Sequence, residues 1–397
     1  MLKQLNPKHN RDLLFFLSYC PFMALSLLCT TFYYRYIMGP FLTNTQIVLT
    51  VILVIHEIYH HKVYGQNWLG LGLLSGLCII AWIQGFSPQQ HLVTMMFLYA
   101  YSARNISFEK LLRVTLYISI AVVSVAVFSG YIGLIDNVVI AKGDRVREYL
   151  GFRYALFLPG ILLNMTAIWF YLRRKNAPVW EAIAWLAVNW IVYVKTDSRI
   201  SFALAALLIV AAVAMRYLPK VVEKLKPLWA AMAGSFVIFG AGSIFMTYIY
   251  DGNIGWMRKL NSMLESRLSL GHNSLERDGF ELFGQHIDWV GNGLNAFGNA
   301  TVGSYTYVDC LYVRILQKYG LIFLLALTVL LTWGMIKLYQ KKQYHILLIL
   351  ATVAVHCVLD DLSISLHYNI FWIAVAVVLM NPAALDGKPE PRLKPPK

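Results

Sequence analysis

The chain has 397 residues, of which 58% are hydrophobic and 14% are charged, and its formal net charge is +14. A soluble globular domain carries about 25% charged residues, so this composition excludes an ordinary soluble protein and indicates a helical membrane protein. Positive charge in such a protein is typical of basic loops at the inner membrane surface, so we expect membrane lipids and no nucleic acid as partners.

Apolar segments recur along the whole chain. Segments of about 17–25 apolar residues are long enough to cross a bilayer as helices, and we predict an all-α, polytopic fold with about 12 transmembrane helices. The helix predicted over 308–337 is longer than one span needs, so we expect its first turns to stand above the membrane. In chain order, the predicted helices cover residues 13–34, 46–60, 68–85, 91–103, 112–135, 154–172, 178–195, 200–217, 229–250, 308–337, 345–361 and 367–381.

The distribution of Lys and Arg sets the predicted orientation. With the N-terminus in the cytoplasm, nearly every inward loop is basic, as at Arg173-Arg174-Lys175, which agrees with the positive-inside rule. Both termini are then cytoplasmic, and one large loop between the ninth and tenth helices faces outward. The predicted segments are transmembrane helices over 1–250, an extracellular loop over 251–307, transmembrane helices over 308–381 and a cytoplasmic tail over 382–397.

Several outward segments carry polar residues that helix packing does not require. Charges at the membrane boundary are costly unless they are paired or lie in a wet cavity. Arg suits a phosphate-binding cavity because its guanidinium gives bidentate hydrogen bonds and keeps its proton, and nearby carboxylates can accept a proton from a sugar hydroxyl. The candidate substrate-binding residues are Arg145, Arg147, Arg153, Arg199, Arg267, His272, Tyr312 and Asp360, and the candidate catalytic residues are Asp309, Asp361 and Arg199.

Some of these side chains also have simpler interpretations. Arg145 and Arg147 have acidic neighbours and can form solvated surface pairs. Arg267 lies in MRKLNSMLESRLSL, whose apolar spacing predicts an amphipathic helix on the membrane, from which Arg267 can simply extend to water. His272 is typical of a surface histidine. The five Cys residues have no metal-ligand spacing, so we expect neither a metal ion nor another cofactor.

Four segments together resemble the Wzy-type polysaccharide polymerases of bacteria, in the superfamily that includes the O-antigen ligases. They are DRVREYLGFRY at 144–154, TDSR at 196–199, SRLSLGHNSLERDGFELFGQ at 266–285 and YVDCLYVRILQKYGLIFLL at 307–325. The motifs are short, and their order and outward placement are more specific than any one of them. The ligases have a His-Asn pair where this chain has Val308-Asp309, so the resemblance favours a polymerase of the Gram-positive type.

The resemblance implies a GT-C-like transmembrane glycosyltransferase of the bacterial cytoplasmic membrane. Such an enzyme transfers oligosaccharide repeat units from undecaprenyl diphosphate to a second lipid-linked unit, building capsule, exopolysaccharide or O-antigen. A chain-length regulator is a further implied partner. We expect Arg153, Arg199 and Arg267 to hold the leaving pyrophosphate, and Asp309 and Asp361 to orient or deprotonate the acceptor hydroxyl. We also expect inversion at the anomeric carbon without a metal ion.

Two other functions stay open. The segment HEIYH at 56–60 matches a zinc-protease pattern, in which His56 and His60 bind the metal and Asp386 of Leu385-Asp386-Gly387 adds a ligand. That ligand would come from a Pro-rich tail, however, and His60 lies at the predicted inner interface, where polar side chains extend to water. A flippase for lipid-linked sugars would share the helix count, but one large outer loop breaks the repeat symmetry typical of transporters.

Overall fold

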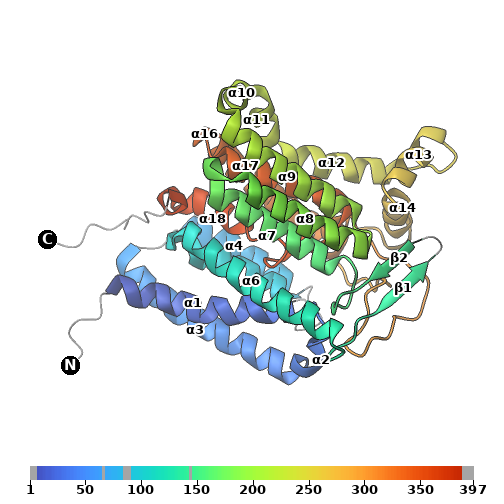
Figure 1. The fold of residues 1–397 in the computed structure, drawn as a ribbon, viewed down its shortest axis with the longest axis horizontal. Coiled ribbons are helices and arrows are strands. Elements are labelled where there is room, and N and C mark those ends of the chain that lie inside the picture. The colour runs from blue at the N-terminus through green and yellow to red at the C-terminus, as the bar shows by residue number, and fades with distance from the viewer. Residues whose placement is uncertain (1–6, 65–67, 84–90, 143–144, 387–397) are drawn as a thin grey trace. The chain divides into compact units, whose positions relative to one another are not determined.

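The computed structural model describes residues 7–64, 68–83, 91–142 and 145–386 (Figure 1). Helices make up 73% of the described residues and strands 3%, so the mostly helical class is confirmed. One element was not expected from the sequence, a β-hairpin of β1 (Val139–Lys142) and β2 (Arg145–Glu148). The chain forms two compact units, one of residues 1–137, 150–152 and 370–397 and one of residues 138–149 and 153–369. The predicted division into transmembrane segments, an extracellular loop and a tail has other boundaries, and it stays a prediction.

The first unit is built around its first helix. α1 (Pro7–Leu28) packs against α3 (Pro40–Tyr64) and α6 (Phe108–Tyr131). Buried hydroxyls tie α1 to its neighbours, because Ser18 Oγ lies 2.7 Å from Tyr99 Oη and Tyr19 Oη lies 2.5 Å from Thr115 Oγ1. The other elements of this unit are α2 (Tyr34–Ile37), α4 (Trp68–Ile83), α5 (Leu92–Ser102), η1 (Ala103–Asn105), α18 (Trp372–Met380) and η4 (Pro382–Asp386).

The second unit holds the hairpin and the remaining helices. α9 packs against both α7 and α8, α12 packs against α17, and α15 packs against α16. The helices of this unit are α7 (Phe157–Arg173), η2 (Arg174–Asn176), α8 (Val179–Thr196), α9 (Arg199–Tyr217), α10 (Pro219–Lys224), α11 (Lys226–Ala233), α12 (Ser235–Tyr248), α13 (Gly255–Met263), α14 (Arg267–Asp278), α15 (Leu311–Lys318), α16 (Gly320–Gln340), α17 (Tyr344–Leu359) and η3 (Leu362–Ile364).

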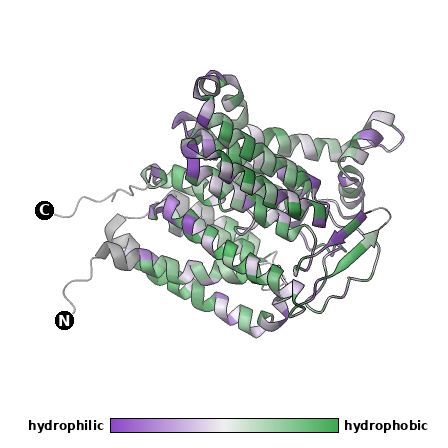
Figure 2. Ribbon diagram, viewed as in Figure 1, coloured by the Kyte–Doolittle hydropathy of each residue, from purple (hydrophilic) through white to green (hydrophobic). Residues whose placement is uncertain are grey.

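Several helices are long and apolar enough to cross a membrane (Figure 2). Within the described residues four pass this test alone, at Pro40–Tyr59, Phe108–Tyr131, Arg199–Tyr217 and Gly320–Gln340. α11 and α12 pass it together but are bent by 57° at their junction. The chain is thus of the membrane-protein type, while the predicted number of about 12 spans is not confirmed.

Breaks in the helices account for much of this difference. The predicted helix over 308–337 is divided at Tyr319, and Gly320 has a φ of +91°, a conformation that an L side chain rarely adopts. The segment predicted over 367–381 supplies only the nine-residue helix Trp372–Met380, whereas the short helix predicted over 91–103 agrees with Leu92–Ser102. Hydropathy detects apolar sequence, but it does not detect where the backbone changes direction.

The large polar loop is folded against α15 and α16. After α14, residues 279–310 form no helix. The backbone crosses the junction of α15 and α16 closely, because a Cβ on Gly284 would overlap the Lys318 carbonyl and one on Gly320 would overlap the Gly284 backbone. Gln317 is fully buried and donates 3.0 and 3.1 Å hydrogen bonds to the carbonyls of Gly279 and Ser274. These contacts fix α14 relative to α15.

Candidate active site

A cavity of about 840 Å³ lies within the second unit. The hairpin, the start of α14 and the polar loop all contribute to its lining. Its charged lining residues are Arg145, Arg147, Glu265, Arg267 and Asp309, and Tyr149, Tyr154 and Tyr305 also line it. The volume is within the range of roughly 300–1,000 Å³ that is usual for small-molecule sites. Three guanidinium groups and two carboxylates therefore line the same cavity.

The hairpin brings two of the arginines to the cavity. Ile140 pairs with Arg147 and Lys142 with Arg145, and directly paired residues of an antiparallel ladder point to the same face. Ile140, Arg145 and Arg147 all line the cavity. Arg145 is held from both sides, because it lies 3.1 Å from an Asp197 carboxylate oxygen and 3.2 Å from one of Glu265.

A strained turn places the next two charged residues. Glu265 and Ser266 both have left-handed backbone conformations, with φ of +50° and +68°. This turn separates α13 from α14, so the predicted single amphipathic helix is two helices. Asn261 holds the turn together, since its carbonyl accepts from the Ser266 amide at 2.8 Å and its side chain accepts from the Ser269 amide at 3.0 Å. A non-glycine residue with positive φ costs free energy, and such strain gathers at functional sites.

Arg267 is the most firmly held of the cavity arginines. Its side chain is only 15% exposed, and its Nε donates a 3.1 Å hydrogen bond to the Leu359 carbonyl. Its Nη1 donates to the carbonyl and the carboxylate of Glu265 at 3.1 and 3.2 Å. Burial alone would lower the pKa of Arg267, but the carboxylates of Asp309 and Glu265 outweigh burial and raise it. This guanidinium therefore stays charged and oriented.

The two cavity carboxylates have opposite pKa shifts. Burial raises the pKa of Asp309 to about 6, although Arg267, 3.9 Å away, opposes the shift. Burial would also raise the pKa of Glu265, but Arg267 and Arg145 prevail and lower it. Tyr305 donates a 2.9 Å hydrogen bond to Asp309. A pair of carboxylates whose environments separate their pKa values is typical of acid–base sites, and Asp309 is the one suited to exchange a proton near neutral pH.

A second charged cluster joins residues that are close to Asp309 in the sequence with residues that follow α17. Asp361 accepts a 3.0 Å hydrogen bond from the Tyr307 hydroxyl and also contacts the Arg314 guanidinium. Burial and the neighbouring Asp361 raise the pKa of Asp360 well above its usual range. Arg314 was not among the predicted site residues. The available signal was a single Arg within the otherwise apolar start of the tenth predicted helix, close to Asp309.

The remaining predicted site residues do not line the cavity. Arg199 is 58% exposed and pairs with Asp197 at 3.2 Å, so it is linked to the cavity only through Arg145. Arg153 is buried and donates a 3.3 Å hydrogen bond to the Leu294 carbonyl. His272 lies 3.1 Å from the Thr247 carbonyl, and Tyr312 donates a 2.9 Å hydrogen bond to the Ala354 carbonyl. Their predicted roles in binding stay predictions.

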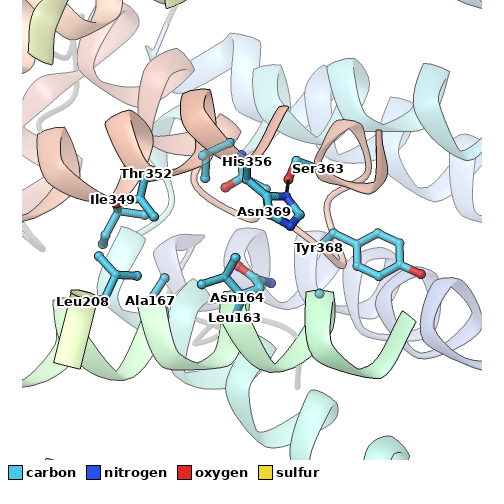
Figure 3. A pocket seen from close by; sticks show the side chains of 12 residues that line it. Leu163, Asn164, Ala167, Leu208, Ile349, Thr352, His356, Ser363, Tyr368 and Asn369 are labelled. Atoms are coloured by element: carbon cyan, nitrogen blue, oxygen red, sulfur yellow. Dashed lines mark hydrogen bonds between the residues drawn. The ribbon is translucent and has the colours of Figure 1, made fainter. Parts of the chain in front are cut away.

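A second cavity lies inside the helical part of the same unit (Figure 3). Its volume is about 10 Å³, which is the space of a single water molecule. Polar side chains meet there, and His356 Nδ1 lies 2.9 Å from Ser363 Oγ while Asn164 donates a 3.2 Å hydrogen bond to the His367 carbonyl. This cavity is too small for a sugar or a diphosphate, so we assign it to internal packing.

The HEIYH segment forms a salt bridge in the first unit. Glu57 lies 2.9 Å from the Arg104 guanidinium, and His56 is fully buried, with its ring 5.7 Å from that of Phe15. The side chain of His60 and the residue Gly387 lie outside the described part of the chain. Within the described part, no three His, Cys, Asp or Glu side chains gather as metal ligands would.

Comparison of the chain with protein-family models, with curated proteins and with solved structures gives no match.

Proposed function

We propose that this chain is a glycosyltransferase of the bacterial cytoplasmic membrane that polymerises oligosaccharide repeat units carried on undecaprenyl diphosphate. One observation carries the proposal. Arg145, Arg147 and Arg267 line one cavity together with Asp309, whose pKa is raised to about 6. Preorganised guanidinium groups stabilise the negative charge that develops on a departing diphosphate, and a carboxylate with such a pKa can accept a proton from a hydroxyl.

The proposed reaction assigns one step to each group. The acceptor hydroxyl transfers its proton to Asp309, and its oxygen forms a bond to the anomeric carbon of the donor sugar. The bond from that carbon to the diphosphate oxygen breaks, and the electron pair leaves with the diphosphate, which the arginines bind. Direct displacement of this kind inverts the anomeric carbon. In-line displacement requires the attacking hydroxyl and the departing diphosphate on opposite sides of the anomeric carbon, so Asp309 would bind the one and the cavity arginines the other.

The size and placement of the cavity support a substrate of this kind. A volume of about 840 Å³ fits a diphosphate with the sugars on either side of the reacting bond, while the rest of a long glycan extends into solvent. The helices long enough to cross a membrane would keep the cavity near the lipid surface, where a polyprenyl carrier is confined. On the predicted orientation the cavity faces outward.

Purified protein in lipid nanodiscs, supplied with fluorescent lipid-linked repeat units and a chelator, tests the proposal. We expect a ladder of products separated by one repeat unit. We expect Arg267→Ala to slow its formation by about 10²-fold, a typical cost of losing one group that stabilises a developing anion. Arg277→Ala is the matched control, because Arg277 lies on the same helix, is half-exposed and pairs with Asp278 at 2.6 Å.

The other outcomes identify the alternatives. Release of free glycan without a ladder would indicate hydrolysis, and movement of the lipid between leaflets without elongation would indicate a flippase. Activity that needs a metal ion would be lost with the chelator and would contradict the predicted metal independence. Arg199→Ala, compared in parallel, tests the direct role predicted for Arg199. A loss as large as that of Arg267→Ala would show that Arg199 contacts the substrate despite its exposed position.

A further inference from the structure

The β1–β2 hairpin has two chemically different faces. On the cavity face lie Ile140, Arg145 and Arg147. Val139, Ala141, Val146 and Glu148 alternate with them on the opposite face. Val139 and Val146 are 59% and 58% exposed, whereas the Glu148 side chain is 14% exposed and is paired with Lys195 of α8. Successive side chains of a strand point to opposite sides, so this separation is built into the sequence. Because Lys195 holds Glu148, the part of this face that stays exposed is apolar, and its transfer out of water would be favourable.

Two ion pairs fix the hairpin at one end of α8. Glu148 lies 3.0 Å from the Lys195 ammonium in the last turn of α8, and Arg145 lies 3.1 Å from Asp197 in the corner between α8 and α9. Figure 1 shows the hairpin next to this end of α8. α8 packs along α9, which is long and apolar enough to cross a membrane. The hairpin therefore lies at the level where this candidate span ends.

The neighbouring surface of α8 has the character of a lipid-facing surface. Trp190, Ile191 and Val194 are exposed on its last two turns, and Val194 directly precedes the Lys195 that holds Glu148. Aromatic and aliphatic residues near the end of a span are typical of the boundary between the acyl chains and the headgroups. The exposed apolar residues of α8 and of the hairpin are therefore neighbours, joined by the Lys195–Glu148 pair, and Figure 2 shows β1 as a largely hydrophobic strand.

We propose that the exposed apolar part of this face, formed by Val139, Ala141 and Val146, is seated in the outer lipid layer. Its continuity with the exposed surface of α8 favours lipid over a protein partner, because a partner would have to displace lipid from α8 as well. The hairpin then acts as a two-sided element at the membrane surface, with lipid on one face and the arginines of the cavity on the other.

This position has a consequence for the substrate, which rests on the proposed function. A diphosphate attached to a polyprenyl chain can reach Arg145 and Arg147 while its hydrocarbon stays in the bilayer. The hairpin would be the surface along which the carrier enters.

An environment-sensitive fluorophore on single cysteines tests the lipid contact without any activity measurement. Val139→Cys and Val146→Cys are labelled in vesicles that contain a spin-labelled quencher lipid, with the unsubstituted chain labelled in parallel as background. Ile140→Cys is the matched control, because Ile140 neighbours Val139 but faces the cavity, and Asp288→Cys, 91% exposed in the polar loop, reports water. We expect quenching at 139 and 146 several-fold stronger than at 140 and 288.

Quenching at 139 and 146 that is as weak as at 288 would overturn the proposal, because it would place the hairpin in water. Protection of 139 and 146 from both the quencher lipid and aqueous iodide would overturn it too, because a protein partner or a second copy would then cover this face. Since neither result depends on glycosyl transfer, failure here is distinguishable from failure of the proposed function.

Discussion

Asp309 combines burial with a partner of opposite charge. Its side chain is 14% exposed, Tyr305 donates a hydrogen bond to it, and Arg267 lies 3.9 Å from it. Burial prevails over Arg267 and raises the pKa to about 6. The ionised fraction of this carboxylate therefore changes within the physiological pH range, which an ordinary Asp would not do.

This shift predicts a pH dependence of the proposed reaction. Only the ionised carboxylate accepts a proton, so we expect the rate to rise with pH, about tenfold per unit well below the pKa, and to level off above about 6. Measurement of ladder formation from pH 4.5 to 8 checks this. We expect Asp309→Asn to lose about 10²–10⁴-fold in rate and to lose the acidic limb of the profile.

The same residue predicts the opposite trend for stability. Because its pKa is raised in the folded state, the folded protein binds this proton more tightly than the unfolded chain does, and its contribution to stability falls as pH rises through about 6. If the acidic limb of the rate profile were unchanged in Asp309→Asn, another group would be responsible for that titration. Asp360 would be the first candidate, because its pKa is also raised.

The sequence indicated some of these residues and could not indicate others. Arg267 and Asp309 were expected because a charge beside an apolar segment is costly without a function or a partner. Glu265 was not singled out, since its importance depends on a left-handed turn and on Arg145, which is 120 residues away. Arg199 was expected for the same reason as Arg267, but its partner Asp197 precedes it by two residues and holds it outside the cavity.

Among the elements, the crossing of the polar loop over the junction of α15 and α16 matters most for the site. Gly284 and Gly320 have φ of +83° and +91°, and their backbones meet without side chains between them. The Leu321 and Ile322 amides donate to the carbonyls of Glu281 and Leu282, each at 3.1 Å. This crossing joins the loop to the start of α16.

We predict that Gly320→Ala destabilises the protein by about 2 kcal/mol or more, since it combines a disfavoured φ with a backbone clash. The thermal unfolding midpoint in detergent micelles measures the loss. Gly242→Ala is the control, because Gly242 lies within α12 with nothing within 4 Å of its Cβ position. Alanine favours a helix by up to about 1 kcal/mol over glycine, so Gly242→Ala should be neutral or stabilising. Equal stability of the two variants would mean that the crossing is not part of the stable fold.

Elements were predicted well where apolar sequence and helix coincide. The segments 178–195 and 200–217 agree closely with Val179–Thr196 and Arg199–Tyr217. The hairpin at 139–148 was missed because its strands have only four residues each. So short a segment shows too little alternation of polar and apolar residues to be recognised as a strand in a mostly helical sequence. Its register decides which arginines face the cavity, so that part of the site could not be predicted either.

On the scale of the whole molecule, composition was sufficient to predict a helical membrane protein. It sums over all 397 residues and does not depend on where any helix begins. The number of spans depends on local breaks such as the 57° bend between α11 and α12 and the division at Gly320. In the part of the chain that the structure describes, four helices, or five with the bent pair, are long and apolar enough for a span. The predicted orientation is a separate matter, because it rests on the basic loops alone.

That orientation predicts which parts of the chain are accessible from outside. A membrane-impermeant maleimide added to intact protoplasts should label Asp288→Cys in the polar loop, and it should label Lys341→Cys between α16 and α17 only after the membrane is opened. Both positions are exposed in the fold, so accessibility to solvent does not distinguish them. The reverse pattern would place the candidate site in the cytoplasm and exclude an outward-facing polymerase.

The turn at Glu265 and Ser266 limits how the sequence around the cavity can drift in evolution. Two consecutive left-handed residues tolerate glycine, asparagine or aspartate, but β-branched side chains are strongly disfavoured there. Ser266 is therefore free to change only within a small set, while Glu265 is restricted further because Arg145 and Arg267 both bind its carboxylate. Natural variants of this chain should keep small or polar residues at these two positions even where the surrounding helices diverge.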